Sequence, residues 1–166
     1  LYQWRHMPGD MVIPNYYINP YVIHSTGFGL EEDVDIVKTD DANDVVSRTF
    51  HRRIYDEGDL ELIKTPVVTY DHAATVRNHA RLEGLFADIL PVVTRGTGYL
   101  SYAPWDWLVR LWGVTETLED LVARPALVHA AMERLTSAYL AWLDQMEEQN
   151  LLALSNASIT GQGGLG

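Results

Sequence analysis

The run Ile89–Thr94 (ILPVVT) decides the fold of this chain. It is almost continuously apolar, which is typical of a strand covered on both faces in a parallel sheet. The segment before it, Asp71–Ala87, places apolar residues at helical spacing, and Asp71 is a residue type suited to the N-cap. A helix that leads into a buried strand predicts an α/β fold.

Three further helices are expected after this strand, one of them Glu116–Ala123 with Thr115 as its N-cap. Pro104–Trp112 (PWDWLVRLW) holds three tryptophans in nine residues, so it should be largely buried, with Asp106 and Arg110 as an i, i+4 polar pair. Pro125 suits the first turn of the longest helix, Pro125–Gln149. One face of that helix is apolar and should pack in the core: Leu127 or Val128, Ala131, Met132, Leu135, Ala138, Tyr139, Trp142, Leu143 and Met146.

The first third of the chain is predicted to form mainly short strands. Met11–Tyr17 is interrupted by Pro14, so it is either an edge strand or a strand that begins after the proline. Val34–Thr39 and Val45–Phe50 flank a turn-rich linker and predict an antiparallel hairpin. Asp56–Ile63 is expected to form a short helix.

The last sixteen residues, Leu151–Gly166 (LLALSNASITGQGGLG), pass from an apolar run into a glycine-rich turn. A buried strand followed by such a turn is how α/β proteins bring backbone close to a ligand. Gly161, Gly163, Gly164 and Gly166 do not follow the dinucleotide-binding GxGxxG spacing, however. The spacing alone favours an ordinary strand-to-helix loop.

Composition limits the classes of function. The 166 residues, 47% of them hydrophobic, suit one domain over 1–166, and the formal net charge of −11 disfavours nucleic acid and anionic lipid as partners. The chain has no cysteine, so any zinc would need histidine and carboxylate ligands. Without a membrane-length apolar run or a signal-peptide pattern, the cytoplasm is the expected location.

The chain starts without methionine and ends inside a loop motif, so we expect a fragment of a longer product. Strand and helix alternate as in a (β/α) barrel. A complete eight-fold barrel usually needs ~200 residues or more, so this chain is expected to supply about half of one. The fold class we predict is therefore α/β, a partial TIM-type (β/α) barrel with an antiparallel β-hairpin excursion near the N-terminus.

Several motifs resemble the uroporphyrinogen decarboxylase superfamily. Glu119–His129 (EDLVARPALVH) carries the pattern D-L-x-x-R-P-x-L-V-H, followed by the long helix, the strand and the glycine-rich loop. Arg95–Trp112, with its Ala-Pro-Trp-Asp, and Gly163–Gly166 resemble a divergent branch of these proteins from anaerobic bacteria. Met7–Asp10 and Val22–Gly29 extend the likeness loosely beyond the second half of the chain.

The resemblance implies a β/α barrel with one of two chemistries. One is methyl transfer involving a corrinoid, often with a zinc-held thiolate; the other is cofactor-free decarboxylation of porphyrinogen acetate groups. The chain lacks the decarboxylase's R-Q-A-G-R type loop and the methyltransferases' His-x-Cys. We expect the intact protein to carry out corrinoid-linked methyl transfer or demethylation, and this segment alone to be inactive. A porphyrinogen carboxy-lyase is the alternative, and a noncatalytic partner-binding module, favoured by exposed tryptophans, is a third.

Three residues are predicted to be catalytic. In a barrel the site lies on loops after the carboxyl ends of strands, which selects Arg95. Its guanidinium can clamp a carboxylate or a corrinoid side chain, and a surface ion pair is an equal alternative. His24, in a Gly-flanked loop, can serve as a base, although an ordinary loop histidine is favoured. Asp106 is a candidate acid, with pairing to Arg110 the favoured explanation.

Other residues are predicted to bind the ligand. Tyr99, Tyr102 and Trp105 can line a flat apolar pocket, although packing on its helix is favoured for Trp105. The C-terminal loop adds Asn156, Gly161, Gly163 and Gly164. The histidines show no HxH or HExxH spacing, so no metal site is predicted here. The expected partners are a small molecule or a corrinoid-protein methyl donor and, through uncovered sheet edges, further copies of the chain.

Overall fold

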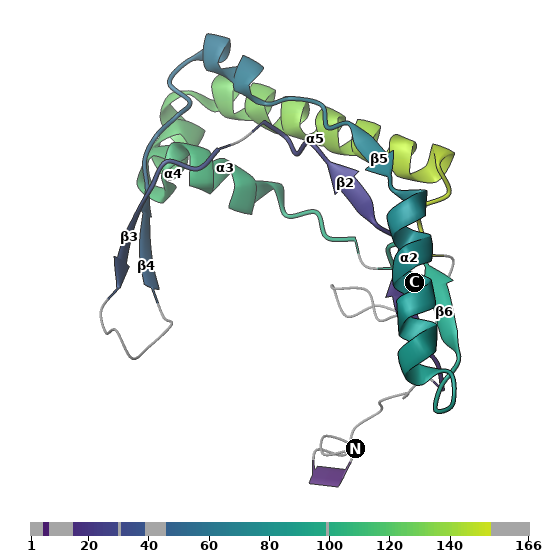
Figure 1. The fold of residues 1–166 in the computed structure, drawn as a ribbon. Coiled ribbons are helices and arrows are strands. Elements are labelled where there is room, and N and C mark those ends of the chain that lie inside the picture. Colours follow the sequence, from purple (N-terminus) through teal and green to yellow (C-terminus); the bar gives the residue numbers. More distant parts are fainter. Residues whose placement is uncertain (1–4, 7–14, 30, 39–45, 99, 154–166) are drawn as a thin grey trace.

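A parallel pair of strands with one covering helix forms the α/β part of the molecule (Figure 1). The computed structural model describes residues 5–6, 15–29, 31–38, 46–98 and 100–153. Within them β1 (Tyr17–Pro20) pairs in parallel with β6 (Val92–Arg95). The helix α2 (His72–Phe86) contacts both strands. This confirms the predicted order of helix and strand.

The signals that bound α2 and β6 are local. The carboxylate of Asp71 accepts a hydrogen bond from the backbone N–H of Ala74 at 2.7 Å, which confirms the predicted N-cap. The predicted strand Ile89–Thr94 begins too early, because Ile89 lies in the turn after α2 and is 73% exposed. The backbone N–H groups of Ile89 and Leu90 both donate to the carbonyl of Phe86, and this keeps them out of the strand.

β1 is an edge strand within the described residues. Its partner is β6 alone, with the N–H groups of Tyr17 and Tyr21 donating to the carbonyls of Pro91 and Arg95. Because alternate residues of a strand turn their backbone groups to opposite sides, Ile18 and Pro20 face the free edge. Because proline has no N–H, Pro20 cannot donate a hydrogen bond to a further strand, as is typical of an edge strand.

A third segment pairs with the chain just after the end of β6. Thr97 and Leu152 form a parallel bridge, in which the N–H of Thr97 donates to the carbonyl of Leu151 at 2.8 Å. The N–H of Ala153 donates to the carbonyl of Thr97 at 2.9 Å. Thus the chain returns in parallel beside the end of β6 after the helices that follow it.

Between β1 and α2 the chain makes an antiparallel excursion. β2 (Ile23–Ser25) pairs with β5 (Val68–Tyr70), and β3 (Val34–Lys38) pairs with β4 (Val46–Phe50). The second pair is the predicted hairpin, which projects at one end of the molecule in Figure 1. The predicted helix near residues 56–63 is present as the 3₁₀ helix η1 (Glu57–Leu62).

Three helices follow β6 along the chain, and the first of them contacts β4 of the hairpin. These are α3 (Pro104–Trp112), α4 (Val114–Ala123) and α5 (Pro125–Glu148), and α5 starts at the proline as predicted. The predicted cap of α4 is wrong, because this helix starts at Val114 with Gly113 as its N-cap, and Thr115 lies inside its first turn. Figure 1 shows α5 running from the hairpin end of the molecule to the β2–β5 end. The predicted apolar face of α5 enters the main core, whose buried members are Ile54, Ile63, Leu108, Leu111, Trp112, Leu127, Val128, Ala131, Leu135 and Ala138.

The motif Asp120 to Pro125 has a structural role. The carboxylate of Asp120 accepts hydrogen bonds from Trp112 Nε1 at 2.8 Å, Arg52 Nη2 at 3.0 Å and both Nε and Nη2 of Arg124. The bonds from Arg124 lower the pKa of Asp120 most, to about 2, with Trp112 and Arg52 adding to them against the effect of burial. One carboxylate therefore ties α4 to α3 and to the segment that follows β4.

The described strands form three two-stranded sheets, which do not close into a barrel. The fold is a mixed α/β arrangement of helices around small sheets.

Candidate functional site

The carboxyl ends of the parallel strands surround a hollow of about 270 Å³. Ligands of α/β proteins bind at this edge of the sheet, because the connecting loops gather there. The hollow lies where β1 ends, where β6 ends and where the third segment begins. Its lining residues are Tyr21, Thr94, Arg95, Gly96, Leu152 and Ala153.

Arg95 lies on the face of the sheet away from α2. The neighbouring Thr94 bonds to His79 of α2, and successive strand residues point to opposite faces. The guanidinium of Arg95 lies over the ring of Tyr16, with its Cζ 4.6 Å from the ring centroid. No acidic side chain of the described residues forms an ion pair with Arg95. Within the described ranges its donors are therefore open to an anion at the strand ends.

Gly96 allows the third segment to approach β6. A Cβ at this position would lie 2.1 Å from the carbonyl oxygen of Leu151 and 2.6 Å from its carbonyl carbon. Both atoms are backbone, so a side chain here would push the segment away. The wall of the hollow that contains Leu152 depends on this glycine.

The other two predicted catalytic residues lie elsewhere. His24 is in the strand β2, opposite Thr69, and not in a loop as predicted. Its main chain takes part in antiparallel pairing, which the flanking glycine signal did not reveal. Asp106 is exposed in the first turn of α3, and the expected pair with Arg110 is wrong, because Arg110 Nη1 instead bonds Glu32 Oε1 at 3.1 Å. Neither His24 nor Asp106 lines the strand-end hollow.

Tyr102, which was predicted to bind ligand, packs on α5. The Tyr102 hydroxyl bonds Thr136 Oγ1 at 2.6 Å, and its ring stacks on Tyr139 with centroids 4.3 Å apart. Burial raises the pKa of Tyr139, with Tyr102 adding to the effect. The prediction that the tryptophan-rich helix is largely buried is right for Trp112, which has no exposed surface, and wrong for Trp105, which is 44% exposed.

Five predicted ligand-binding residues fall outside the described part of the chain: Tyr99, Asn156, Gly161, Gly163 and Gly164.

Sequence reasoning missed a hydrogen-bonded chain between the sheet and α2. Asn19 Nδ2 lies 3.1 Å from Thr94 Oγ1, which lies 2.9 Å from His79 Nδ1. His79 Nε2 lies 3.3 Å from Glu83 Oε1. If the Thr94 hydroxyl donates to Nδ1, the ring carries its proton on Nε2, the nitrogen that lies 3.3 Å from Glu83 Oε1. The i, i+4 spacing of His79 and Glu83 was visible in the sequence, but their link to β1 and β6 was not.

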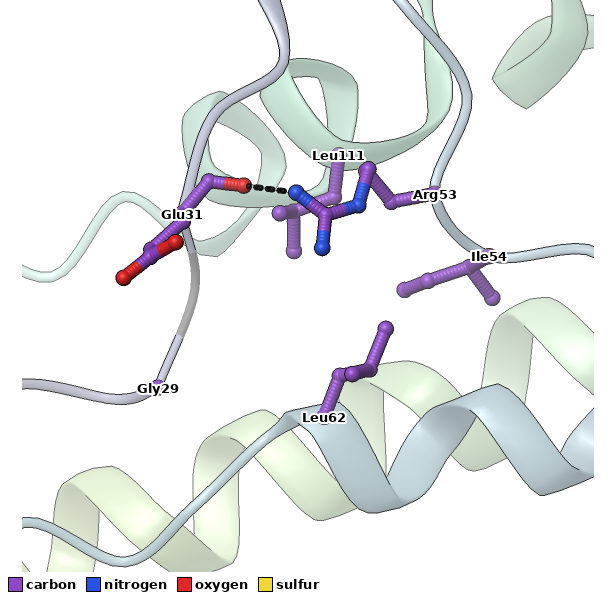
Figure 2. Close-up of a pocket in the computed structure, with 6 residues that line it drawn as sticks. All are labelled: Gly29, Glu31, Arg53, Ile54, Leu62 and Leu111. Atoms are coloured by element: carbon purple, nitrogen blue, oxygen red, sulfur yellow. Dashed lines mark hydrogen bonds between the residues drawn. The ribbon is translucent and has the colours of Figure 1, made fainter.

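A second feature, shown in Figure 2, is a packing cavity. Arg53 Nη1 crosses it to donate to the carbonyl oxygen of Glu31 at 3.0 Å. Its volume is only about 10 Å³, which is at the lower limit for a single water molecule. It cannot hold a substrate. The lining residues are Gly29, Glu31, Arg53, Ile54, Leu62 and Leu111.

The described residues hold no group of three or more histidine, aspartate or glutamate side chains placed to bind a metal ion. The zinc that the resemblance implies therefore has no fitting ligand set among them. In this part of the chain no helix has the length and apolar character needed to cross a membrane.

No protein-family model, curated protein or solved structure matches this chain.

Proposed function

We propose that the strand-end hollow binds the anionic group of a small-molecule substrate, with Arg95 as the binding residue. One observation carries this proposal. Arg95 stands at the carboxyl end of a parallel strand with no acidic partner among the described residues. A planar guanidinium suits a carboxylate, because two parallel N–H groups can bond both oxygens.

The size of the hollow supports a small substrate. Its volume of about 270 Å³ is near the lower end of the range of about 300–1,000 Å³ for small-molecule sites. A corrinoid exceeds that range, so the hollow fits at most one side chain of such a macrocycle. We therefore propose that a corrinoid would be presented by a partner protein, while Arg95 holds the substrate.

For the reaction we propose corrinoid-linked methyl transfer or demethylation in a partial (β/α) barrel. The support is the motif resemblance together with the parallel order of β1, β6 and the segment at Leu152. The carboxy-lyase alternative calls for several arginines around the substrate. Within the described residues, Arg95 is the one arginine that lines the hollow.

Two measurements test the proposal separately. Cobalamin binding and zinc content of the complete gene product, set beside those of this 166-residue chain, test the reaction class. Binding of cobalamin, free or carried by a corrinoid protein, to the complete product supports methyl transfer, and the absence of both kinds of binding removes that reaction. Binding of succinate to this chain tests the hollow itself. Loss of succinate binding in Arg95→Gln supports the anion site whatever the reaction proves to be.

A further inference from the structure

The helix α4 buries polar residues and exposes apolar ones. Thr117 and Asp120 are buried, and the hydroxyl of Thr117 donates to the carbonyl of Gly113 at 2.6 Å. A surface helix ordinarily does the opposite and buries its apolar side. The exposed apolar residues of α4 are Val114, Leu118, Leu121 and Val122, of which Leu118 is 60% and Val122 86% exposed.

These four residues, which we call the α4 face, form a continuous stripe. Their spacing of i, i+4, i+7 and i+8 places them on one side of the helix. The helix packs on α3 and α5, and its buried residues lie on the other side. Apolar residues at this spacing are the anchors of helices that dock on a partner, and a contiguous exposed apolar patch marks an interaction site.

The charges beside the α4 face are acidic. Glu119 lies three residues before Val122, and Glu116 lies three residues before Glu119, so the two carboxylates form a row along one border of the face. Both are exposed, and neither forms an ion pair within the described part of the chain. Val114–Ala123 contains no lysine or arginine. A partner with positive charge therefore suits this border.

The same charges disfavour a second copy of the chain as the occupant. A second α4 face would bring its own Glu116 and Glu119, and each copy carries a formal net charge of −11. Charges of like sign oppose such an association, whereas opposite charges guide a partner to the face and fix its orientation.

We infer that the α4 face binds a basic amphipathic helix of a partner protein. The apolar side of that helix covers Leu118 and Val122, and its lysines or arginines lie beside Glu116 and Glu119. Burial of apolar surface supplies most of the affinity, and the charges supply specificity. This surface is separate from the strand-end hollow, because no residue of α4 lines that hollow.

The probe is a designed helical peptide of leucine and lysine in which the leucines form one face. Binding to the 166-residue chain is followed by fluorescence anisotropy of the labelled peptide at pH 7 and physiological ionic strength. We expect the double variant Leu118→Ser, Val122→Ser to bind the peptide about tenfold more weakly or worse, because central apolar anchors carry most of the binding energy. Leu140→Ser is the matched control and should bind like the unchanged chain, since Leu140 is 54% exposed on α5 outside the α4 face. A peptide with glutamate in place of lysine should bind more weakly, because it meets the acidic border.

Four results would overturn the inference. Three concern the peptide: no binding at millimolar concentration, equal affinity in the double variant and the unchanged chain, and equal affinity of the glutamate and lysine peptides. The fourth is a dimer of the unchanged chain, seen by sedimentation, that the double variant dissociates, because a second copy would then cover the face. Thermal unfolding of each variant shows whether it is folded, and the exposure of the substituted side chains predicts that all of them are.

Discussion

Substitution of Gly96 by alanine should detach the third segment of the parallel sheet. The new Cβ would lie 2.1 Å from the Leu151 carbonyl oxygen, and relief of that contact requires a backbone shift of about 1 Å. The shift breaks the bonds from Thr97 N–H to Leu151 and from Ala153 N–H to Thr97, now 2.8 and 2.9 Å long.

The expected loss in the free energy of unfolding comes from the two hydrogen bonds and from the burial of Leu151. Two backbone hydrogen bonds contribute about 2 kcal/mol together. Leu151 has no exposed surface, and its partial exposure adds up to about 2 kcal/mol. We expect Gly96→Ala to lower the free energy of unfolding by about 2–4 kcal/mol.

Urea unfolding, followed by tryptophan fluorescence, measures the change in the free energy of unfolding. The two proteins can be compared directly if their m-values are equal. Gly84→Ala is the matched control, since Gly84 lies in α2 with no atom within 4 Å of an added Cβ. It should raise stability by about 0.5–1 kcal/mol. If Gly96→Ala unfolds within about 0.5 kcal/mol of the unchanged chain, the close approach of Gly96 and Leu151 is refuted.

Three further predictions concern the charged network and a helix cap. Asp120→Asn should lower the free energy of unfolding by about 2–4 kcal/mol at pH 7, because Arg52 and Arg124 lose a buried anionic partner. Equal urea midpoints of the two proteins would contradict this. Because the pKa of Asp120 is lowered to about 2, its stabilisation is present above about pH 4 and is lost as the pH falls toward 2. The stability difference between the two proteins should therefore shrink over that range, and a constant difference would exclude a charged Asp120. Asp71→Ala should cost about 1 kcal/mol by removing the cap on the Ala74 N–H, and it should lower the helical circular-dichroism melting point.

The elements set by neighbouring residues were predictable from the sequence. The Asp71 cap, the start of α5 at Pro125 and the β3–β4 hairpin follow from signals within a few residues. The apolar periodicity of α5 also identified the core face correctly. Such signals need no knowledge of distant segments.

The pairings between distant segments were not predictable. Asn19 and Thr94 are 75 positions apart, and Arg52 and Asp120 are 68 apart. Hydrophobic periodicity does not indicate which strands pair with each other. The partner of a given ion-pairing residue depends on that tertiary arrangement. For the same reason Arg110 was assigned to Asp106, its neighbour on the helix, and not to Glu32.

The candidate site was predictable in part. The rule that sites follow the carboxyl ends of parallel strands selected Arg95, which does line the strand-end hollow. The rule could not select Tyr21, because nothing in the sequence showed that β1 pairs with β6. It also could not place His24, whose neighbouring glycine suggested a loop and not the strand β2.

The most direct test of the central claim is the affinity of succinate for the unchanged chain and for Arg95→Gln, measured by calorimetry at one ionic strength. Arg77→Gln serves as the control of equal charge, since Arg77 is exposed on α2 outside the hollow. The account predicts that succinate binds the chain and the control alike, and about tenfold or more weakly to Arg95→Gln. Equal binding by Arg95→Gln, or no binding by the unchanged chain at millimolar succinate, would contradict it.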